Sequence, residues 1–248
     1  MVGLSQVGAP VERAVEAVET VQRTAAEATV PRRVALARGR IGLLVASLAF
    51  LGFVGIFALV RANRSGAIDV GITMKLQRRR WPWLARLMAA ASWPGFPPQS
   101  WAIPPTIVAM IWALGFRLEA GFQLLAWGTA LLSSFVKAIM KRPRPNHPGI
   151  RVVVAPLGGS SFPSGHTITY MGVYGFLAYC AYTLIKPAAI RWPAVAFLCG
   201  LLGLVGPSRI YQGHHWPTDV TASYLLGLSY LIGLTALYRR VKARWRAA

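Results

Sequence analysis

The chain has 248 residues, of which 55% are hydrophobic, and a formal net charge of +20 from 27 Lys and Arg against 7 Asp and Glu. Its long uncharged apolar runs exclude an ordinary water-soluble domain and predict an integral membrane protein. The positive charge favours contact with an anionic membrane surface or a phosphorylated ligand. Nucleic acid is not an expected partner, because the basic residues are spread over every loop between the apolar runs.

The N-terminal segment 1–40 precedes the first apolar run. Val11, Val15 and Val18 recur there at helical spacing among Glu and Arg, which predicts either an amphipathic helix on the membrane surface or a flexible tail. The run 41–60 is long enough to cross a bilayer. Because it lacks a small-residue cleavage site, we interpret it as a retained helix and not as a signal peptide.

The connection after this first run, residues 61–100, is basic and rich in tryptophan. Three arginines at 78–80 precede Trp81 and Trp83, a composition that suits a helix lying in the membrane interface with its indoles at headgroup depth. We expect this helix to end at the prolines that begin with Pro94.

Five further apolar runs predict that the chain crosses the membrane six times. The expected spans are 41–60, 103–116, 120–140, 166–185, 192–206 and 217–238. The second and fifth are short, and we expect them to extend through Trp101 and Pro187. The expected fold is all-α: a polytopic six-transmembrane helix bundle over residues 41–240, with an interfacial amphipathic helix between the first two spans and a basic tail at 241–248.

Small residues within the spans are assigned to packing. Cys180 and Cys199 fit no zinc-ligand spacing and are given no chemistry. Glycines three residues apart are expected to let helices approach closely; they are Gly52/Gly55, Gly172/Gly175 and Gly200/Gly203/Gly206.

Two short strings with the composition of a phosphate site border the third and fourth spans. Lys137 lies seven residues before Arg144, and the prolines around Arg144 break the helix, so that both cations can hold one anion. Pro163-Ser164-Gly165-His166 opens the fourth span, where free backbone N–H groups and the helix dipole favour a phosphate. Gly165 permits close approach, and Ser164 adds a hydroxyl donor.

A third string lies between the fifth and sixth spans. Ser208-Arg209 closes the fifth span, and His215 opens the sixth, with Asp219 four residues later. On a helix this spacing lets the carboxylate accept a hydrogen bond from one ring nitrogen of His215 and leaves the other as a nucleophile. His166 has no such neighbour and suits a general acid. Since an even number of spans separates the two connections, all three strings are expected on one side of the membrane.

The three strings resemble the signature of the type 2 phosphatidic acid phosphatase superfamily at every position: Lys-x6-Arg-Pro, Pro-Ser-Gly-His and Ser-Arg-x5-His-x3-Asp. The resemblance implies a membrane lipid phosphatase in which His215 attacks phosphorus to form a phosphohistidine, Asp219 orients His215, and His166 protonates the leaving group. It assigns the binding of the phosphoryl oxygens to Lys137, Arg144, Ser164, Gly165 and Arg209. Residues 1–40 lie outside it.

No metal or other cofactor is expected, because seven acidic residues are too few for a two-metal site with several clustered carboxylates. The favoured substrate is a polyprenyl diphosphate such as undecaprenyl diphosphate, with phosphatidate or phosphatidylglycerophosphate as alternatives. Phosphotransfer to another lipid, or lipid binding or transport without catalysis, are further alternatives. The distribution of Lys and Arg slightly favours cytoplasmic termini in a cell membrane, and the resemblance implies an extracytoplasmic active site.

Overall fold

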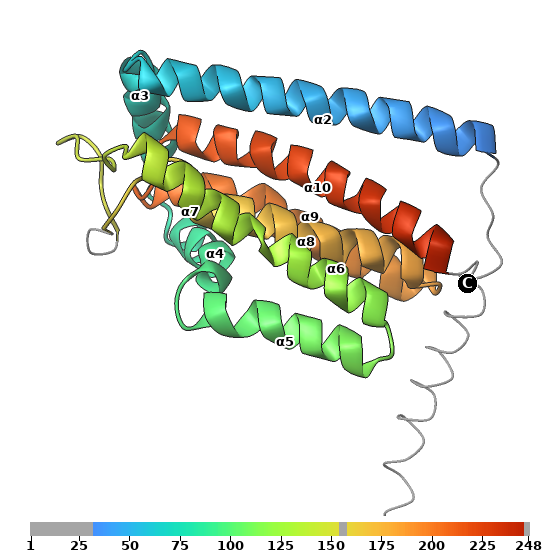
Figure 1. Ribbon diagram of the computed structural model, residues 1–248. Helices are drawn as coiled ribbons and strands as arrows, with labels where there is room; N and C mark the ends of the chain where they lie inside the picture. The colour runs from blue at the N-terminus through green and yellow to red at the C-terminus, as the bar shows by residue number, and fades with distance from the viewer. Residues whose placement is uncertain (1–31, 154–157, 246–248) are drawn as a thin grey trace, which may run out of the picture.

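The computed structural model describes residues 32–153 and 158–245, which form a helical protein without a β-strand. Residues 1–31, on which most of the expected N-terminal amphipathic helix falls, lie outside this part of the chain. The described helices are α2 (Arg32–Arg61), α3 (Gly66–Gln77), α4 (Pro82–Ser92), the 3-10 turn η1 (Trp93–Gly95), α5 (Gln99–Ala113), α6 (Arg117–Trp127), α7 (Thr129–Met140), α8 (Gly165–Leu184), α9 (Ala188–Tyr211) and α10 (Pro217–Trp245). Most of them lie side by side along one direction (Figure 1).

Four helical segments are long and apolar enough to cross a membrane: Gly39–Arg61, Arg117–Met140, Ala188–Tyr211 and Pro217–Trp245. They coincide with the first, third, fifth and sixth expected spans, and the third is α6 and α7 joined at Gly128. The second expected span is α5, which has 15 residues and includes Trp101, as predicted. The fourth is α8, whose 20 residues include threonines, tyrosines and a histidine.

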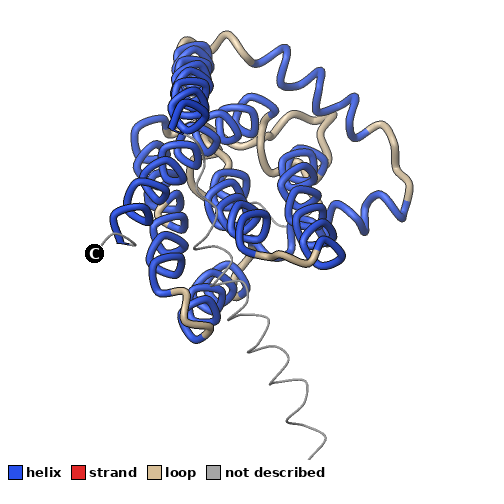
Figure 2. The backbone as a smooth tube through the Cα atoms, turned by 90° about the vertical axis from the view of Figure 1, so that its right-hand side faces the viewer, coloured by secondary structure: helices blue, strands red, loops and turns tan. Residues whose placement is uncertain are grey.

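The mixed composition of α8 follows from its position inside the bundle. It contacts α6, α7, α9 and α10, and most of its residues are buried. Figure 2 views the bundle nearly along the axes of its long helices, which are seen end-on and next to one another. Polar side chains in membrane helices are tolerated where they face the interior of the bundle and not the lipid, so α8 can carry polar groups at the end of the bundle where the expected site lies.

Glycines at helix contacts behave in part as predicted. A Cβ on Gly172 would overlap the carbonyl oxygen of Ala126 and the side chain of Thr129, so α8 touches the α6–α7 junction there. A Cβ on Gly206 would be 2.6 Å from both Tyr224 Oη and Val220 Cγ1. The prediction is wrong for Gly55, Gly200 and Gly203, where an added Cβ meets nothing within 4 Å.

The variant Gly172→Ala is therefore expected to be less stable than the wild type by about 1–3 kcal/mol, the usual cost of overpacking, since a backbone oxygen has to move. Thermal unfolding of the purified protein in detergent checks this, with Gly200→Ala as the matched control. A melting temperature of Gly172→Ala equal to that of the control would contradict the close contact of α8 with α6.

The connection 61–100 contains two helices and not one. α3 ends at Gln77, and α4 begins at Pro82, a residue suited to a first helical turn. α3 carries Asp69, Thr73 and Gln77 at four-residue spacing on a buried polar face. The polar face of α3 therefore packs into the protein. The basic and tryptophan-rich composition of the connection did not predict this packing.

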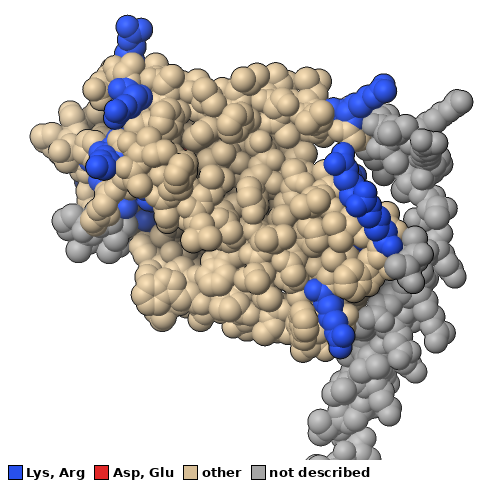
Figure 3. Space-filling view, in the orientation of Figure 1, with Lys and Arg blue, Asp and Glu red and all other residues tan. Residues whose placement is uncertain are grey.

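Charged side chains avoid the middle of the molecule. On the face shown in Figure 3, Lys and Arg lie at the two ends, and a broad uncharged belt separates them. Large apolar side chains on the helices are exposed to the surroundings, among them Leu43, Leu131, Phe135 and Phe197. An uncharged, apolar perimeter of this kind is what a lipid bilayer requires, and it confirms the predicted membrane protein.

Candidate active site

The three strings meet at one end of the bundle. α7 ends there at Met140, α8 begins at Gly165, α9 ends at Tyr211, and α10 begins at Pro217, all at the end marked by α3 in Figure 1. The structure therefore places both connections at the same end of the bundle.

The imidazole of His215 is buried and has a defined orientation. Its Nδ1 lies 2.7 Å from the backbone carbonyl oxygen of Ser161. A carbonyl oxygen only accepts hydrogen bonds, so Nδ1 carries the proton and Nε2 is unprotonated. Burial, together with the positive charges of Arg209 and Lys137, holds the pKa of His215 well below its usual range. The ring is therefore uncharged and nucleophilic at Nε2 near neutral pH.

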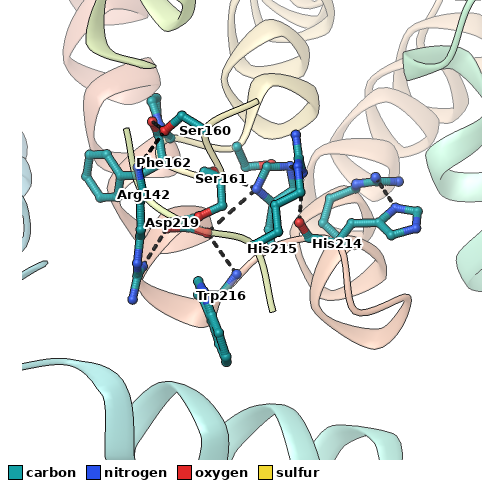
Figure 4. A network of polar contacts seen from close by, with 12 residues as sticks. Arg142, Ser160, Ser161, Phe162, His214, His215, Trp216 and Asp219 are labelled. Carbon is teal, nitrogen blue, oxygen red and sulfur yellow. Dashed lines mark hydrogen bonds and ion pairs between the residues drawn. The ribbon is translucent and has the colours of Figure 1, made fainter. Parts of the chain in front are cut away.

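The carboxylate of Asp219 does not make the predicted hydrogen bond to His215. His215 Nδ1 and Asp219 Oδ2 are 3.7 Å apart, and His215 lies before α10 begins, so that helical spacing does not apply to the pair. Asp219 instead accepts from Arg142 Nη1 at 2.5 Å and from the backbone N–H of Trp216 at 2.9 Å (Figure 4). Asp219 thus places a fixed negative charge beside the imidazole, while Ser161 selects the tautomer.

Arg144 lies on the other side of the same imidazole. Its Nη1 is 3.4 Å from His215 Nε2 and donates to the carbonyl oxygen of His214 at 2.9 Å, while Nε donates to the carbonyl oxygen of Gly158 at 3.2 Å. Burial lowers the pKa of this guanidinium, but an arginine remains charged near neutral pH. The positive charge of Arg144 therefore lies next to the position that an anionic phosphoryl group would occupy when Nε2 attacks it.

Arg209 is fully buried at the end of α9. Its Nη1 donates to Ser92 Oγ at 3.0 Å and to Gln212 Oε1 at 2.8 Å, and Nη2 contacts His214 Nδ1. Its Nε has no hydrogen-bond partner among the described residues. A buried N–H without a partner calls for an explanation in a folded protein, and an anionic ligand would supply the missing acceptor.

His166 lies in the first turn of α8, as predicted. Its Nε2 is shielded from solvent and has no partner among the described residues. The ring packs edge-on against Phe96 with centroids 4.7 Å apart, and a Cβ on Gly95 would overlap it. Phe96 also covers the guanidinium of Arg209 at 4.7 Å. The turn around η1 thus closes over two polar groups of the site, a role that composition did not indicate.

The other predicted phosphate ligands are tied to the chain. Lys137 Nζ donates to the carbonyl oxygens of Ser160 and Pro163, both at 2.7 Å, which leaves one of its three N–H groups free. Ser164 is the N-cap of α8, and its Oγ accepts from Thr167. Gly165 faces Lys137, whose Cε would be 3.8 Å from an added Cβ. Ser164 therefore organises the helix start by accepting hydrogen bonds, and its own O–H remains available to donate, so the predicted hydroxyl donor stays a prediction.

A cavity of about 310 Å³ extends from these groups between α5, α7 and α8. Lys137, Gly165 and His166 line its polar end, and Pro104 and Val173 lie on its apolar walls. This volume is within the range of small-ligand sites, which are mainly apolar with a few placed polar groups. The combination suits a molecule with an anionic head and an apolar tail.

Sequence reasoning missed four polar residues of the site. Arg142 binds Asp219 and also Asp69 of α3. Ser161 orients His215 through its backbone, and His214 contacts Arg209. Burial and Arg209 lower the pKa of His214 to about 3, so it is uncharged beside Arg209. Two features of the sequence could have indicated these residues. They are a second Arg-Pro pair, at Arg142, and the presence of Asp69 as the single acidic residue within 61–100.

Fold and site together define a membrane-embedded helical protein with a histidine nucleophile in a cluster of arginine and lysine side chains, the arrangement of a phosphoryl-transfer enzyme. Residues 118–243 match the family model of the PAP2 superfamily, and the chain belongs to that family. It is therefore a phosphoric ester hydrolase by class.

Curated relatives and solved structures agree with this assignment. Phosphatidylglycerophosphatase B of Bacillus subtilis is 30% identical over 186 residues, which cover 72% of this chain and 87% of the relative. Undecaprenyl-diphosphatase BcrC of the same organism is 31% identical over 128 residues, or 49% of this chain and 61% of the relative. The crystal structure of the transmembrane PAP2 type phosphatidylglycerolphosphate phosphatase from Bacillus subtilis has a TM-score of 0.70 at 25% identity, covering 79% of this chain and 96% of that chain.

Proposed function

We propose that the chain is a membrane lipid phosphatase that passes a phosphoryl group from a lipid phosphate or diphosphate to His215 and then to water. The observation that carries this proposal is the hydrogen bond from His215 Nδ1 to the Ser161 carbonyl, which leaves Nε2 unprotonated beside Arg144. A nucleophile and a cation for the developing negative charge are thus within reach of one phosphorus atom.

The proposed first step forms the bond from His215 Nε2 to phosphorus and breaks the bond from phosphorus to the leaving oxygen. His166 in its protonated form donates a proton to that oxygen. Lys137, Arg144 and Arg209 stabilise the charge on the phosphoryl oxygens, and the backbone N–H of Gly165 begins α8 beside them. In the second step, water loses a proton to His166 and displaces the imidazole from phosphorus.

The proposed substrate class is a polyprenyl diphosphate such as undecaprenyl diphosphate, supported by the similarity to undecaprenyl-diphosphatase BcrC. Phosphatidylglycerophosphate is the second candidate, supported by the longer match to phosphatidylglycerophosphatase B. Phosphatidate is the third. The cavity beside His166, polar at one end and apolar along its walls, suits each of these lipids.

The proposed membrane arrangement has six spans, with α5 and α8 as the second and fourth. Residues 41–240 form the phosphatase domain, preceded by the tail 1–40 and followed by the basic tail 241–248. α4 lies in the membrane interface, because its N-cap Trp81 and its residues Trp83 and Leu87 are exposed, while Met88 and Ala91 are buried against the protein. With both termini cytoplasmic in the cell membrane, the site opens on the extracytoplasmic side.

The proposed chemistry is metal-independent. Among the described residues, no group of three or more His, Cys, Asp or Glu side chains gathers as a set of metal ligands. We expect detergent-purified protein to release inorganic phosphate from undecaprenyl diphosphate, phosphatidylglycerophosphate or phosphatidate at the same rate with and without excess EDTA, because side-chain cations supply the charge stabilisation.

Loss of phosphate release in EDTA, restored by added Mg²⁺, would contradict this account. Formation of a phosphorylated second lipid or sugar, with no release of inorganic phosphate, would instead identify a phosphotransferase using the same intermediate. The relative rates on the three lipids rank the proposed substrates.

A further inference from the structure

A chain of buried ion pairs lies behind His215 and reaches outside the three signature strings. Arg142 Nη1 lies 2.5 Å from Asp219 Oδ1, and Arg142 Nη2 lies 2.6 Å from Asp69 Oδ2. Both carboxylates are fully buried, and the arginine side chain is 11% exposed. One guanidinium therefore joins the connection after α2 to the carboxylate beside the nucleophile.

Asp69 is also bound directly to the start of α10. Its Oδ1 accepts from the backbone N–H of Thr218 at 2.9 Å, and its Oδ2 accepts from Thr218 Oγ1 at 2.9 Å. Thr218 immediately precedes Asp219 in the first turn of α10. A carboxylate at a helix N-terminus satisfies free N–H groups and interacts favourably with the helix dipole. Asp69 thus holds the residue next to Asp219 as well as the arginine bound to Asp219.

The charges of the Asp219–Arg142–Asp69 cluster leave a net negative charge beside His215 when all three groups are ionised. A single arginine paired with Asp219 would largely cancel the field of the carboxylate at His215. With Asp69 as a second carboxylate, the three groups carry a net charge of −1 when all are ionised. The site then keeps a negative charge 3.7 Å from His215 Nδ1, where a phosphorylated imidazole becomes cationic.

We propose that Asp69 is a positioning residue of this enzyme: through Arg142 and Thr218 it fixes the carboxylate of Asp219 beside His215 and keeps the net charge of the three ionised groups negative. The inference rests on the proposed function, since it assigns Asp69 a role in forming the phosphohistidine. It also explains why α3 turns a polar face into the protein. Arginine suits this position because the two Nη groups of one planar guanidinium donate to different carboxylates, Asp219 and Asp69.

The test is Asp69→Asn, which keeps the size of the side chain and removes its charge. We expect kcat to fall by about 10²-fold, the size of effect seen when a catalytic group is misplaced by about 1 Å, with little change in KM. Rates are measured per active site. The number of active sites is the amount of enzyme that becomes phosphorylated when phosphatidate or undecaprenyl diphosphate is added. A merely structural role would lower the amount of active protein and leave this kcat unchanged.

Glu119→Gln is the matched control. Glu119 is another buried carboxylate, 2.5 Å from Lys242 Nζ, at the opposite end of the bundle where α6 begins and α10 ends. The Glu119→Gln variant loses a comparable ion pair that does not touch the site. Its kcat per active site is therefore expected to equal that of the wild type. The double variant Asp69→Asn with Arg142→Lys should be no slower than the slower single variant, because the two residues act as one unit.

Each outcome decides the proposal. A wild-type kcat in Asp69→Asn, with turnover in the wild type and none in His215→Ala, overturns the positioning role and leaves the proposed function intact. No turnover in the wild type overturns the proposed function and this inference with it. If Asp69→Asn does not fold, Arg142→Lys decides the question: an unchanged kcat per active site overturns the role, and a fall at constant KM supports it.

Discussion

The variant His215→Ala is expected to lose at least about 10⁴-fold of the wild-type rate of phosphate release, the scale on which removal of a catalytic nucleophile acts. His215 supplies the only imidazole whose unprotonated Nε2 lies beside Arg144 in the described part of the chain. Without it, the cations still bind the phosphoryl group, but no side chain at this position attacks phosphorus. We therefore expect KM to change much less than kcat.

His147→Ala is the matched control for this loss. His147 is exposed, and its Nδ1 accepts only from the backbone N–H of Gly149 at 3.1 Å. Its removal deletes an imidazole from the connection between α7 and α8 without touching His215, which lies between α9 and α10. Activity of His215→Ala within tenfold of this control, on the order of 1.4 kcal/mol in barrier height, would be incompatible with a histidine nucleophile.

The variant His166→Asn is expected to discriminate between the two kinds of substrate. A general acid contributes about 10²–10⁴-fold when the leaving oxygen needs a proton. Phosphatidate loses an alkoxide, which needs that proton, whereas a lipid diphosphate loses a lipid monophosphate, which is stable as an anion. We expect the full loss on phosphatidate and a clearly smaller loss on undecaprenyl diphosphate, measured as kcat on each lipid with one enzyme preparation.

Equal losses of kcat on the two lipids would mean that His166 acts on phosphate binding and not on the leaving group. The geometry favours the acid role, because His166 Nε2 has no protein partner in the described structure and lines the cavity that would receive the lipid. The comparison of variants on both substrates therefore separates the two roles without relying on the absolute rate.

The sequence predicted where the site lies because helix ends are marked locally. Pro143 and Pro145 cannot continue α7, Ser164 caps α8, and Pro217 begins α10. Once the spans are placed, their connectivity brings these ends together. The predicted cations and histidines consequently meet in the structure, although spacing alone could not show which groups each of them touches.

The partners of those groups were not predictable, because they depend on backbone positions far apart in the chain. The carbonyl of Ser161 binds His215 from the connection before α8. Asp69 reaches Arg142 and Thr218 from α3, although the composition around it suggested a single interfacial helix. Helical spacing placed Asp219 against His215, but the helix starts only at Pro217, and the carboxylate turns toward Arg142 instead.

The glycines show the same limit for packing. Gly172 and Gly200 both lie in glycine pairs or triplets within apolar helices, but only Gly172 meets another helix. A spacing of three residues identifies one face of a helix and does not show whether a neighbour covers it. The covered face became known only from the arrangement of α6 and α8.

The most direct test of the central claim is to detect the covalent intermediate. Enzyme mixed with undecaprenyl diphosphate or phosphatidate carrying ³²P on the terminal phosphate is quenched in alkali within a single turnover, and the labelled peptide is identified by mass spectrometry. The account predicts phosphorus on His215 in the wild type, more of it in a variant slow in the second step, and none in His215→Ala. Phosphate release by wild type without label on His215, or label on another residue, would contradict it.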